Sequence, residues 1–341
     1  LKSKTISIMR RTFFFFLIFF LFSGSCFAQF LFPVNYYENE GEIRYGRFDV
    51  SDNKVFWPLG KKGLLVFDAS DVENLQKLKL YRPYEIRSYN KEFGSANAIK
   101  VFDEKAYFAH GDLGFEILDI SNITAPEVLG TYYRHMKVFN FKMFKNYAIL
   151  ALDNMGVEVV DINNYQDINM VSRKNYKDVH VNNVAIYKNY LYASCGAYGL
   201  KIIPYNAPLE AFEGNNYASN YLTDEEAHKV LVYGDYAILA NDSDGLSIMD
   251  LSLPEHPAPV QNVETTGKAM DIIIEDYLLY VATTEGIEVY NISDLSNIYK
   301  IDEYSDNRRE FQKLVLEGNN LYATYKSGWL FWKKYGMMIF A

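Results

Sequence analysis

The stretch Asn241-Asp242-Ser243-Asp244-Gly245-Leu246-Ser247-Ile248-Met249-Asp250-Leu251 decides the fold of this chain. It contains polar turn residues, then a glycine, then an apolar strand that ends in an aspartate. Three close and three looser copies occur elsewhere in the chain, and their glycines are Gly114, Gly156, Gly286, Gly63, Gly199 and Gly328. The seven glycines follow one another at intervals of 41 to 51 residues. A nearly constant period of this size indicates a repeat architecture.

Each repeat contains four short apolar runs. Around Gly245 these runs are residues 230–233, 236–240, 246–250 and 260–263, and Gly, Asp, Asn and Pro separate them. The predicted hairpin turns before the second run are Lys145-Asn146, Lys188-Asn189, Gly234-Asp235, Glu275-Asp276 and Asn319-Asn320. The second and third runs are apolar almost throughout, which is typical of a sheet covered on both faces. The sequence therefore predicts an all-β fold, a seven-bladed β-propeller of four-stranded antiparallel blades.

The ring can be closed by either end of the chain. The outermost strand of the last blade comes either from Leu31–Tyr37 or from Gly336–Ala341. We expect the C-terminal segment to supply it, because that segment follows residues 329–333 after a short turn. Two longer segments, 82–97 and 204–217, interrupt the regular pattern, and loops tolerate such insertions at little cost.

The N-terminal residues resemble an export signal. Arg10 and Arg11 precede an uninterrupted apolar run at 13–22, and small residues lead to Ala28. A basic region, a short apolar core and a small-residue cleavage site predict a signal peptide over 1–28 and a single propeller domain over 29–341. The alternative is lipidation of Cys26, which would attach the protein to a membrane. Cleavage after Ala28 leaves only Cys195, so we expect no internal disulfide and a buried thiol.

The charge of the chain limits its partners. The formal net charge is −9, and removal of residues 1–28 takes away four basic residues and no acidic one. A surface of this sign repels phosphate backbones, so we expect no binding to nucleic acid. An exported protein with this composition fits an extracellular or envelope protein or glycan as its partner. We expect the protein to be monomeric.

The repeat motif resembles a known family. Gly245-Leu-Ser-Ile-Met-Asp-Leu-Ser252 and Gly114-Phe-Glu-Ile-Leu-Asp-Ile-Ser121 are similar to the repeat of the LVIVD family of bacterial envelope propellers. The resemblance covers most of residues 45–330, and Pro204 and Trp332 stand where the motif has Asp. It implies a propeller outside the cytoplasm and transfers no catalytic residue. The repeated aspartates are interpreted as structural, because Asp and Asn accept backbone N–H bonds at strand ends.

Candidate binding residues follow from the topology of a four-stranded meander. The segment entering the inner strand and the loop between the second and third strands lie on the same face of the disc. We call this the entry-loop face, and we expect the ligand to bind there. Its candidate binding residues are His110, Arg134, His135, Asp153, His180, His228, Asp242, Asp244, Asp271 and Glu285.

The sequence does not favour a cofactor or a metal. His135, His180 and His228 come from three consecutive blades, and imidazoles suit zinc or copper, but their offsets to the following turn differ. Asp242-Ser243-Asp244-Gly245 lacks the alternating oxygen ligands and the distal Glu of a helix-loop-helix calcium site. Phosphate-binding loops, zinc-protease helices and nucleophile elbows are not found in the sequence. We expect a binding module without a cofactor. The alternative is an envelope carbohydrate-active hydrolase or lyase that uses acids at the channel mouth, such as Asp153 and Asp242.

Overall fold

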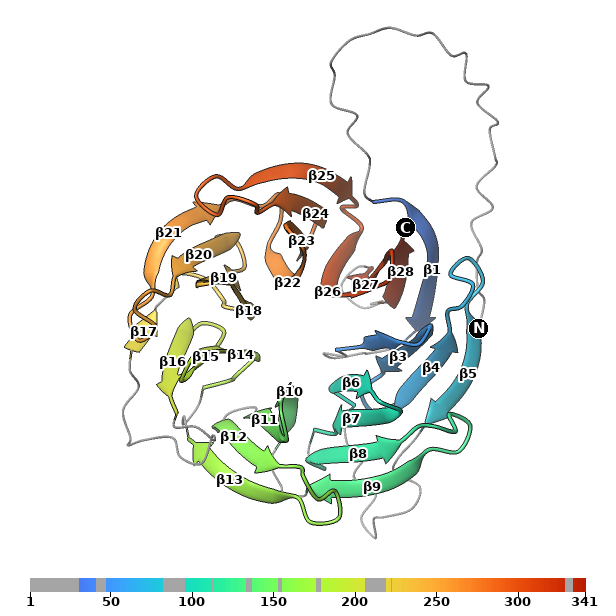
Figure 1. The fold of residues 1–341 in the computed structure, drawn as a ribbon. Helices are drawn as coiled ribbons and strands as arrows, with labels where there is room; N and C mark the ends of the chain where they lie inside the picture. The colour runs from blue at the N-terminus through green and yellow to red at the C-terminus, as the bar shows by residue number, and fades with distance from the viewer. Residues whose placement is uncertain are drawn as a thin grey trace, which may run out of the picture.

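The predicted propeller is confirmed by the computed structural model. The described residues are 31–40, 47–81, 96–111, 113–132, 137–152, 155–175, 179–205, 219–221, 223–328 and 334–341. Their 28 strands form seven four-stranded antiparallel sheets, and Figure 1 shows these sheets as blades around a central axis. The predicted signal peptide, residues 1–28, lies outside the described residues, as do 82–95 and 206–218, which include most of the two insertions.

The blades follow one another along the chain, and each runs from its inner strand outward. Blade 1 contains β2 (Asp49–Ser51), β3 (Lys54–Pro58), β4 (Leu64–Asp68) and β5 (Gln76–Tyr81). Blade 2 contains β6 (Ala98–Phe102), β7 (Lys105–Ala109), β8 (Phe115–Asp119) and β9 (Glu127–Tyr132). Blade 3 contains β10 (Val138–Phe144), β11 (Tyr147–Leu152), β12 (Gly156–Asp161) and β13 (Asn169–Lys174). Blade 4 contains β14 (Asn183–Tyr187), β15 (Tyr190–Ser194), β16 (Leu200–Pro204) and β17 (Ser219–Tyr221). Blade 5 contains β18 (Lys229–Tyr233), β19 (Tyr236–Ala240), β20 (Leu246–Asp250) and β21 (Ala258–Val263). Blade 6 contains β22 (Ala269–Glu275), β23 (Leu278–Thr283), β24 (Gly286–Asn291) and β25 (Tyr299–Ser305).

The seventh blade joins the two ends of the chain. Its order from the axis outward is β26 (Arg309–Glu317), β27 (Asn320–Ser327), β28 (Lys334–Phe340) and β1 (Pro33–Glu40). The expectation that the C-terminal segment is the outermost strand is therefore wrong. The segment 334–340 is the third strand, and residues 329–333 lie outside the described residues. β1 completes the blade, because pairing the N-terminal strand with β28 covers the edge that β28 would otherwise expose.

β1 also attaches the seventh blade to the first. The ring of Tyr37 packs edge-on against Trp57 at 5.9 Å and against Phe67 at 4.8 Å between ring centroids. Trp57 and Phe67 are buried in the middle strands of blade 1. The outermost strand of blade 7 is thus held by backbone pairing on one side and by aromatic packing on the other.

Turn geometry explains the repeated residues. Gly245 has φ +71°, and the N–H of Asn241 donates to its carbonyl at 2.9 Å. The carboxylate of Asp250 accepts the N–H of Ser252 at 2.6 Å, as the structural interpretation of the repeated aspartates predicts. Two of the predicted hairpin turns are displaced by one residue, because Glu275 pairs with Leu278 and Glu317 pairs with Asn320. The turn residues there are 276–277 and 318–319.

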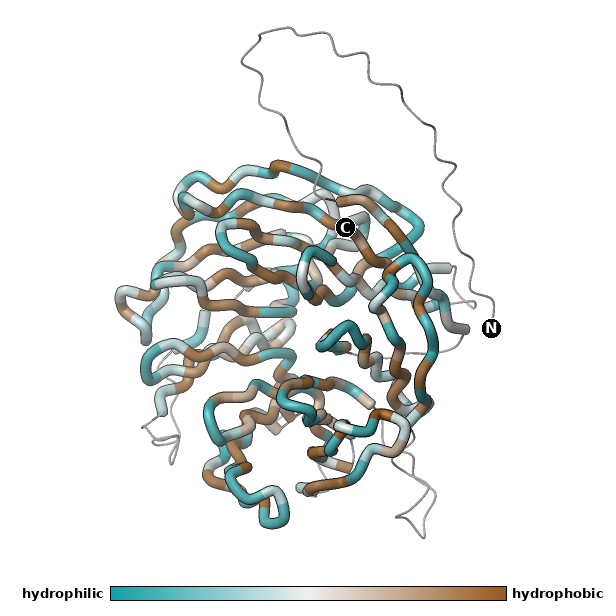
Figure 2. The backbone as a smooth tube through the Cα atoms, turned by 45° about the vertical axis from the view of Figure 1, so that its right-hand side comes forward, coloured by the Kyte–Doolittle hydropathy of each residue, from teal (hydrophilic) through white to brown (hydrophobic). Residues whose placement is uncertain are grey.

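The core lies between neighbouring blades. Leu246 and Ile248 of blade 5 form one apolar cluster with Ile272 and Val281 of blade 6, and similar clusters fill the other blade interfaces. Figure 2 shows apolar colour along many of the strands and hydrophilic colour at many of the turns. Burial of the middle strands on both faces confirms the interpretation of their apolar runs. The described segments contain no helix with the length and apolar character needed to cross a membrane.

Candidate functional site: the charged central channel

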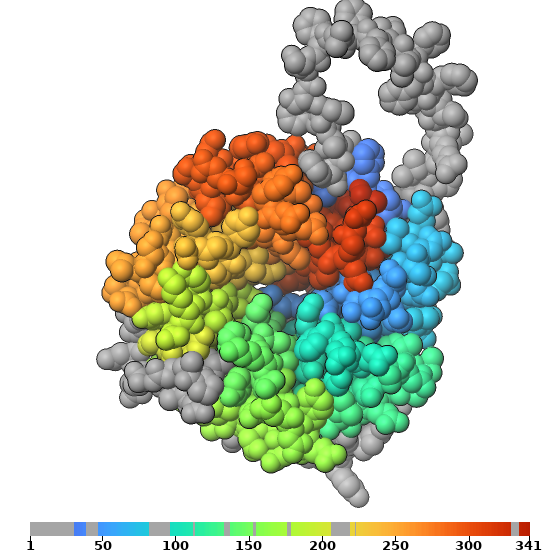
Figure 3. All heavy atoms as spheres, viewed as in Figure 1, coloured from blue at the N-terminus to red at the C-terminus, as the bar shows by residue number. Residues whose placement is uncertain are grey.

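The two predicted loop sets share one face of the disc. Isolated bridges connect the second-to-third loop of one blade to the entry segment of the next, as in Gly196 with Ala227 and Asp242 with Ala269. Within blade 5, the entry residue His228 contacts the loop residue Asp242. The prediction that these loops lie on a common face is therefore confirmed. Figure 3 shows that the disc is hollowed at its centre.

A level of polar side chains surrounds the axis near this face. Each stands on an inner strand or just before one, and most pair with a small residue on the second strand, as Lys229 does with Ala240 and Asp271 with Ala282. Arg47 lies at the same level, because it bridges Ala98 of blade 2. We call this level the upper ring, and its polar members are Arg47, Asn140, Asn183, Lys229, Asp271 and Lys313. Directly opposite residues of an antiparallel pair share a face of the sheet, so the small partner leaves room for a long side chain.

Asp271 is the only carboxylate of the upper ring and is almost fully buried, at 1% exposed. It lies 3.0 Å from Lys229 Nζ and 3.9 Å from Lys313 Nζ, and it accepts the N–H of Leu314 at 2.8 Å. Burial opposes its ionisation, but the charges of Lys229, Lys313 and Arg47 together hold its pKa below the usual value. Asp271 is therefore a charged element of the channel rather than an accessible surface acid.

The cations of the upper ring outnumber this carboxylate. Burial and the neighbouring charges of Arg47 and Lys229 lower the pKa of Lys313 to about 7, although Asp271 acts in the opposite direction. Burial also lowers the pKa of Lys229. Arg47 reaches across the channel from blade 1 to blade 4, where its Nη2 donates to the carbonyl of Asn182 at 2.8 Å. A single carboxylate, Asp271, thus faces three cations that lie close to the axis.

A second polar level lies two residues further along the inner strands, and here only blades 1 to 3 contribute. Lys100 Nζ lies 2.8 Å from Asp49 Oδ1, and the N–H of Val101 donates to Asp49 Oδ2 at 2.7 Å. Burial, followed by repulsion from Lys100, lowers the pKa of Lys142. No carboxylate of the described residues forms an ion pair with Lys142. This lower ring adds two cations and one carboxylate to the channel.

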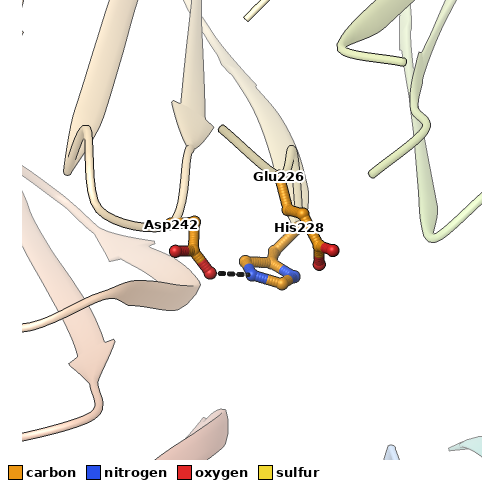
Figure 4. A group of neighbouring side chains, drawn as sticks. All are labelled: Glu226, His228 and Asp242. Atoms are coloured by element: carbon orange, nitrogen blue, oxygen red, sulfur yellow. Dashed lines mark hydrogen bonds and ion pairs between the residues drawn. The ribbon is translucent and has the colours of Figure 1, made fainter. Parts of the chain in front are cut away.

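A second cluster lies at the rim, above the inner strand of blade 5 (Figure 4). His228 Nε2 is 3.1 Å from Asp242 Oδ2, and Lys268 Nζ is 2.5 Å from Asp242 Oδ1. Burial lowers the pKa of His228 although Asp242 opposes this shift. For Asp242, burial favours the neutral acid, but the hydrogen bonds from Lys268, His228 and Ser243 hold its pKa below the usual value. The result is a neutral imidazole beside an ionised carboxylate.

The rim cluster contains possible metal ligands. Donor atoms of Glu226, His228 and Asp242 lie within 4.8 Å of one another. However, the Lys268 ammonium occupies one oxygen of Asp242 and places a positive charge where a cation would bind. The arrangement therefore fits a hydrogen-bonded ion network better than a metal centre. Sequence reasoning missed Glu226, although its position two residues before His228 in the same entry segment places it near that histidine.

The other predicted binding residues lie in different environments. Asp244 accepts from the amide of Asn241 at 3.2 Å within its turn, and His180 and Glu285 are exposed. His110 is only 4% exposed and its Nε2 lies 3.5 Å from Glu116. Its expected place on the binding surface is thus corrected, because its side chain is buried and its ring packs edge-on against Phe108. Arg134, His135 and Asp153 lie outside the described residues.

The single cysteine of the propeller is buried, as expected. Cys195 is 1% exposed, and burial raises the pKa of its thiol to about 12. A thiol with such a pKa stays protonated near neutral pH and is a poor nucleophile.

Comparisons with known proteins agree with the fold. A family model described as the LVIVD repeat matches residues 93–133, 225–265 and 266–306. Three similar solved structures are the computationally designed Ika8 protein, a protein from Lactobacillus plantarum and a chain of the mitotic checkpoint complex. Their TM-scores are 0.61, 0.61 and 0.63, each at 11% identity, and they cover 92%, 78% and 90% of this chain and 99%, 86% and 96% of their own. At this identity they show the fold alone. Among curated proteins, no significant match to the chain is found.

Proposed function

We propose that this β-propeller, in which three stretches match the LVIVD repeat, is an exported binding module, secreted or held at the cell surface. Its ligand is a protein or a glycan that lies over the channel on the entry-loop face. The features of residues 1–28 support export. A Cys26 lipid anchor would keep the same face available at the cell surface.

One observation carries the placement of the ligand. Arg47, Lys229 and Lys313 surround the single carboxylate of Asp271 at the axis. Burying an uncompensated charge costs free energy, and the blades pack through apolar clusters that do not need it. Charged groups retained in a concave site despite this cost favour a role in binding. The rim residues His228, Asp242 and Lys268 add hydrogen-bonding groups around the same opening.

The test is a binding screen with purified 29–341 against immobilised envelope glycans and envelope proteins. We expect saturable binding, and we expect His228→Ala and Lys268→Met to weaken it by roughly tenfold or more, as removal of a central contact does. The matched control is Asn319→Ala on the opposite face, where a cavity of about 490 Å³ opens between blades 6 and 7. Loss of binding in the control but not in the rim variants would contradict the placement. Absence of saturable binding to either ligand class would contradict the function.

The enzyme alternative predicts a different result. A carbohydrate-active hydrolase or lyase would release products from an envelope polysaccharide, and Asp242→Asn would abolish that turnover. Both oxygens of Asp242 are already engaged, one by Lys268 and one by His228, so no specific observation favours Asp242 as a free acid or base. Turnover that depends on Asp242 would replace the binding proposal.

A further inference from the structure

The channel has a charge opposite to that of the whole chain. The formal net charge of the protein is −9, yet its two rings contain five cations and two carboxylates. The cations are Arg47, Lys100, Lys142, Lys229 and Lys313, and the carboxylates are Asp49 and Asp271. A concave site with low-dielectric walls concentrates the field of its charges, so the channel attracts anions despite the acidic surface.

Within the upper ring, Lys313 is the cation best placed to meet a ligand. Its side chain is 19% exposed, and its Nζ stands 3.9 Å from Asp271, beyond hydrogen-bond distance. No described residue accepts a hydrogen bond from this ammonium group, which has three N–H donors. Lys229, by contrast, lies 3.0 Å from Asp271 and forms the closer ion pair with it. The donors of Lys313 are therefore available to an acceptor that enters from the channel mouth.

We propose that the upper ring binds an oxyanion, a carboxylate or phosphate-type group of the ligand, with Lys313 as the main donor and Arg47 and Lys229 as supporting charges. This inference rests on the proposed function, since it gives the chemistry of the group that the entry-loop face recognises. An oxyanion would bring the acceptor that Lys313 lacks and would balance the excess positive charge of the ring. Charge-assisted hydrogen bonds of this kind are among the strong polar contacts in proteins.

Binding of such an anion is coupled to the protonation of Lys313. The groups that face Lys313 are Arg47 before β2, Lys229 on β18 and Asp271 on β22, and His228 also senses its charge. In the free protein the pKa of Lys313 is about 7, so this lysine loses its charge above that pH. A bound anion favours the charged form and raises the pKa. Affinity is thus complete below about pH 7 and falls by up to ~tenfold per pH unit above it, until the pKa of the bound state is reached.

The experiment uses the full propeller, residues 29–341, with sulfate and acetate as probes, because neither titrates between pH 6 and 9. Lysine labelled with ¹³C at Cε allows the pKa of Lys313 to be followed by NMR, with Lys313→Met identifying its signal. At constant ionic strength we expect either probe to raise this pKa more than chloride does. A larger shift with sulfate identifies a phosphate-type ligand, and a larger shift with acetate identifies a carboxylate.

Three variants distinguish anion binding at Lys313 from nonspecific attraction of anions by positive charge. Lys313→Met should abolish probe binding, and Lys313→Arg should keep binding but lose its pH dependence between pH 7 and 9. Lys77→Met is the matched control, because it removes one positive charge from the exposed outer strand of blade 1, and it should leave binding unchanged. Equal shifts with all three anions, or equal losses in Lys313→Met and Lys77→Met, would refute the oxyanion site. A positive probe result without any glycan or protein ligand would leave the site intact and refute the proposed function alone.

Discussion

Substitution of Gly245 by alanine tests the turn that recurs through the propeller. A Cβ atom at Gly245 would lie 2.3 Å from the carbonyl oxygen of Val263 and 3.0 Å from the N of Thr265, both of which are backbone atoms. The residue also has φ +71°. Gly234 has a similar φ of +57°, but a Cβ there would meet nothing within 4 Å. The two glycines therefore differ in steric contact and share the same kind of backbone conformation.

The expected loss of stability follows from the backbone conformation and from the steric contact. A left-handed conformation costs an L-residue about 1–2 kcal/mol, and this applies to both Gly234→Ala and Gly245→Ala. Lys145 and Lys188 occupy the matching turn position in other blades at positive φ, so we expect Gly234→Ala to lie at the lower end of that range. Forcing an atom into a closely packed site adds ~1–3 kcal/mol. We expect Gly245→Ala to lower the free energy of unfolding by ~2–5 kcal/mol and Gly234→Ala by ~1 kcal/mol.

Urea unfolding, followed by far-UV circular dichroism and by Trp fluorescence, measures the difference. If both probes coincide and the m-value is unchanged, the midpoints report the free energies directly. Equal midpoints for the two variants would refute the close approach of Gly245 to the end of β21. An unchanged midpoint for Gly245→Ala would also refute the assignment of its positive φ.

Three further predictions concern buried groups. Glu158 is fully buried and hydrogen-bonded to Tyr132 and Arg173. In urea unfolding, Glu158→Gln should lower the free energy of unfolding by about 3 kcal/mol, because it leaves the Arg173 charge unpaired. The control Glu127→Gln, at an exposed position, should change the free energy of unfolding little, and equal effects of the two variants would contradict this role of Glu158. The pKa of His110 is lowered by burial from 6.5 to about 3, so its neutral form contributes stability that is complete above about pH 6.5 and is lost as the pH falls towards 3. A stability profile between pH 7 and 4 should therefore be flatter for His110→Gln than for the unchanged protein, and parallel profiles would argue against a buried neutral imidazole. Tyr37→Ala should lower the free energy of unfolding by ~2–3 kcal/mol through lost packing on Trp57 and Phe67. Tyr299→Ala, at an exposed position, should have little effect. Similar urea midpoints for the two variants would contradict the attachment of β1 to blade 1.

Much of the architecture was predictable because local sequence patterns determine it. The glycine of each repeat and the aspartate of most repeats specify a turn and a strand end, as the contacts of Gly245 and Asp250 confirm. Turn positions could shift by one residue, as at Glu275, because Asp276 suits either position of a two-residue turn. Closure by β1 was not predictable, since it joins strands separated by nearly the whole chain and depends on which edge is left uncovered.

The candidate site was predictable only in part. The shared face follows from the alternation of a meander, and it placed His228 and Asp242 on that face without predicting their contact. The sequence does contain a signal for the upper ring, namely a small residue near the end of most second strands, such as Ala240 or Ala282. That signal indicates where a long side chain fits, and it does not indicate which charges meet across the axis.

By itself, the sequence determined the all-β class, the seven repeats, the turn glycines and the structural role of the repeated aspartates. These features depend on backbone conformation and on apolar periodicity within about forty residues, which are readable one repeat at a time. Only the tertiary structure decided that β1 closes the ring, that His110 is buried, and that Arg47, Lys229 and Lys313 converge on Asp271. The reason is that Coulomb interactions and burial depend on distances between blades, and residues far apart in the chain come close only when the ring is closed.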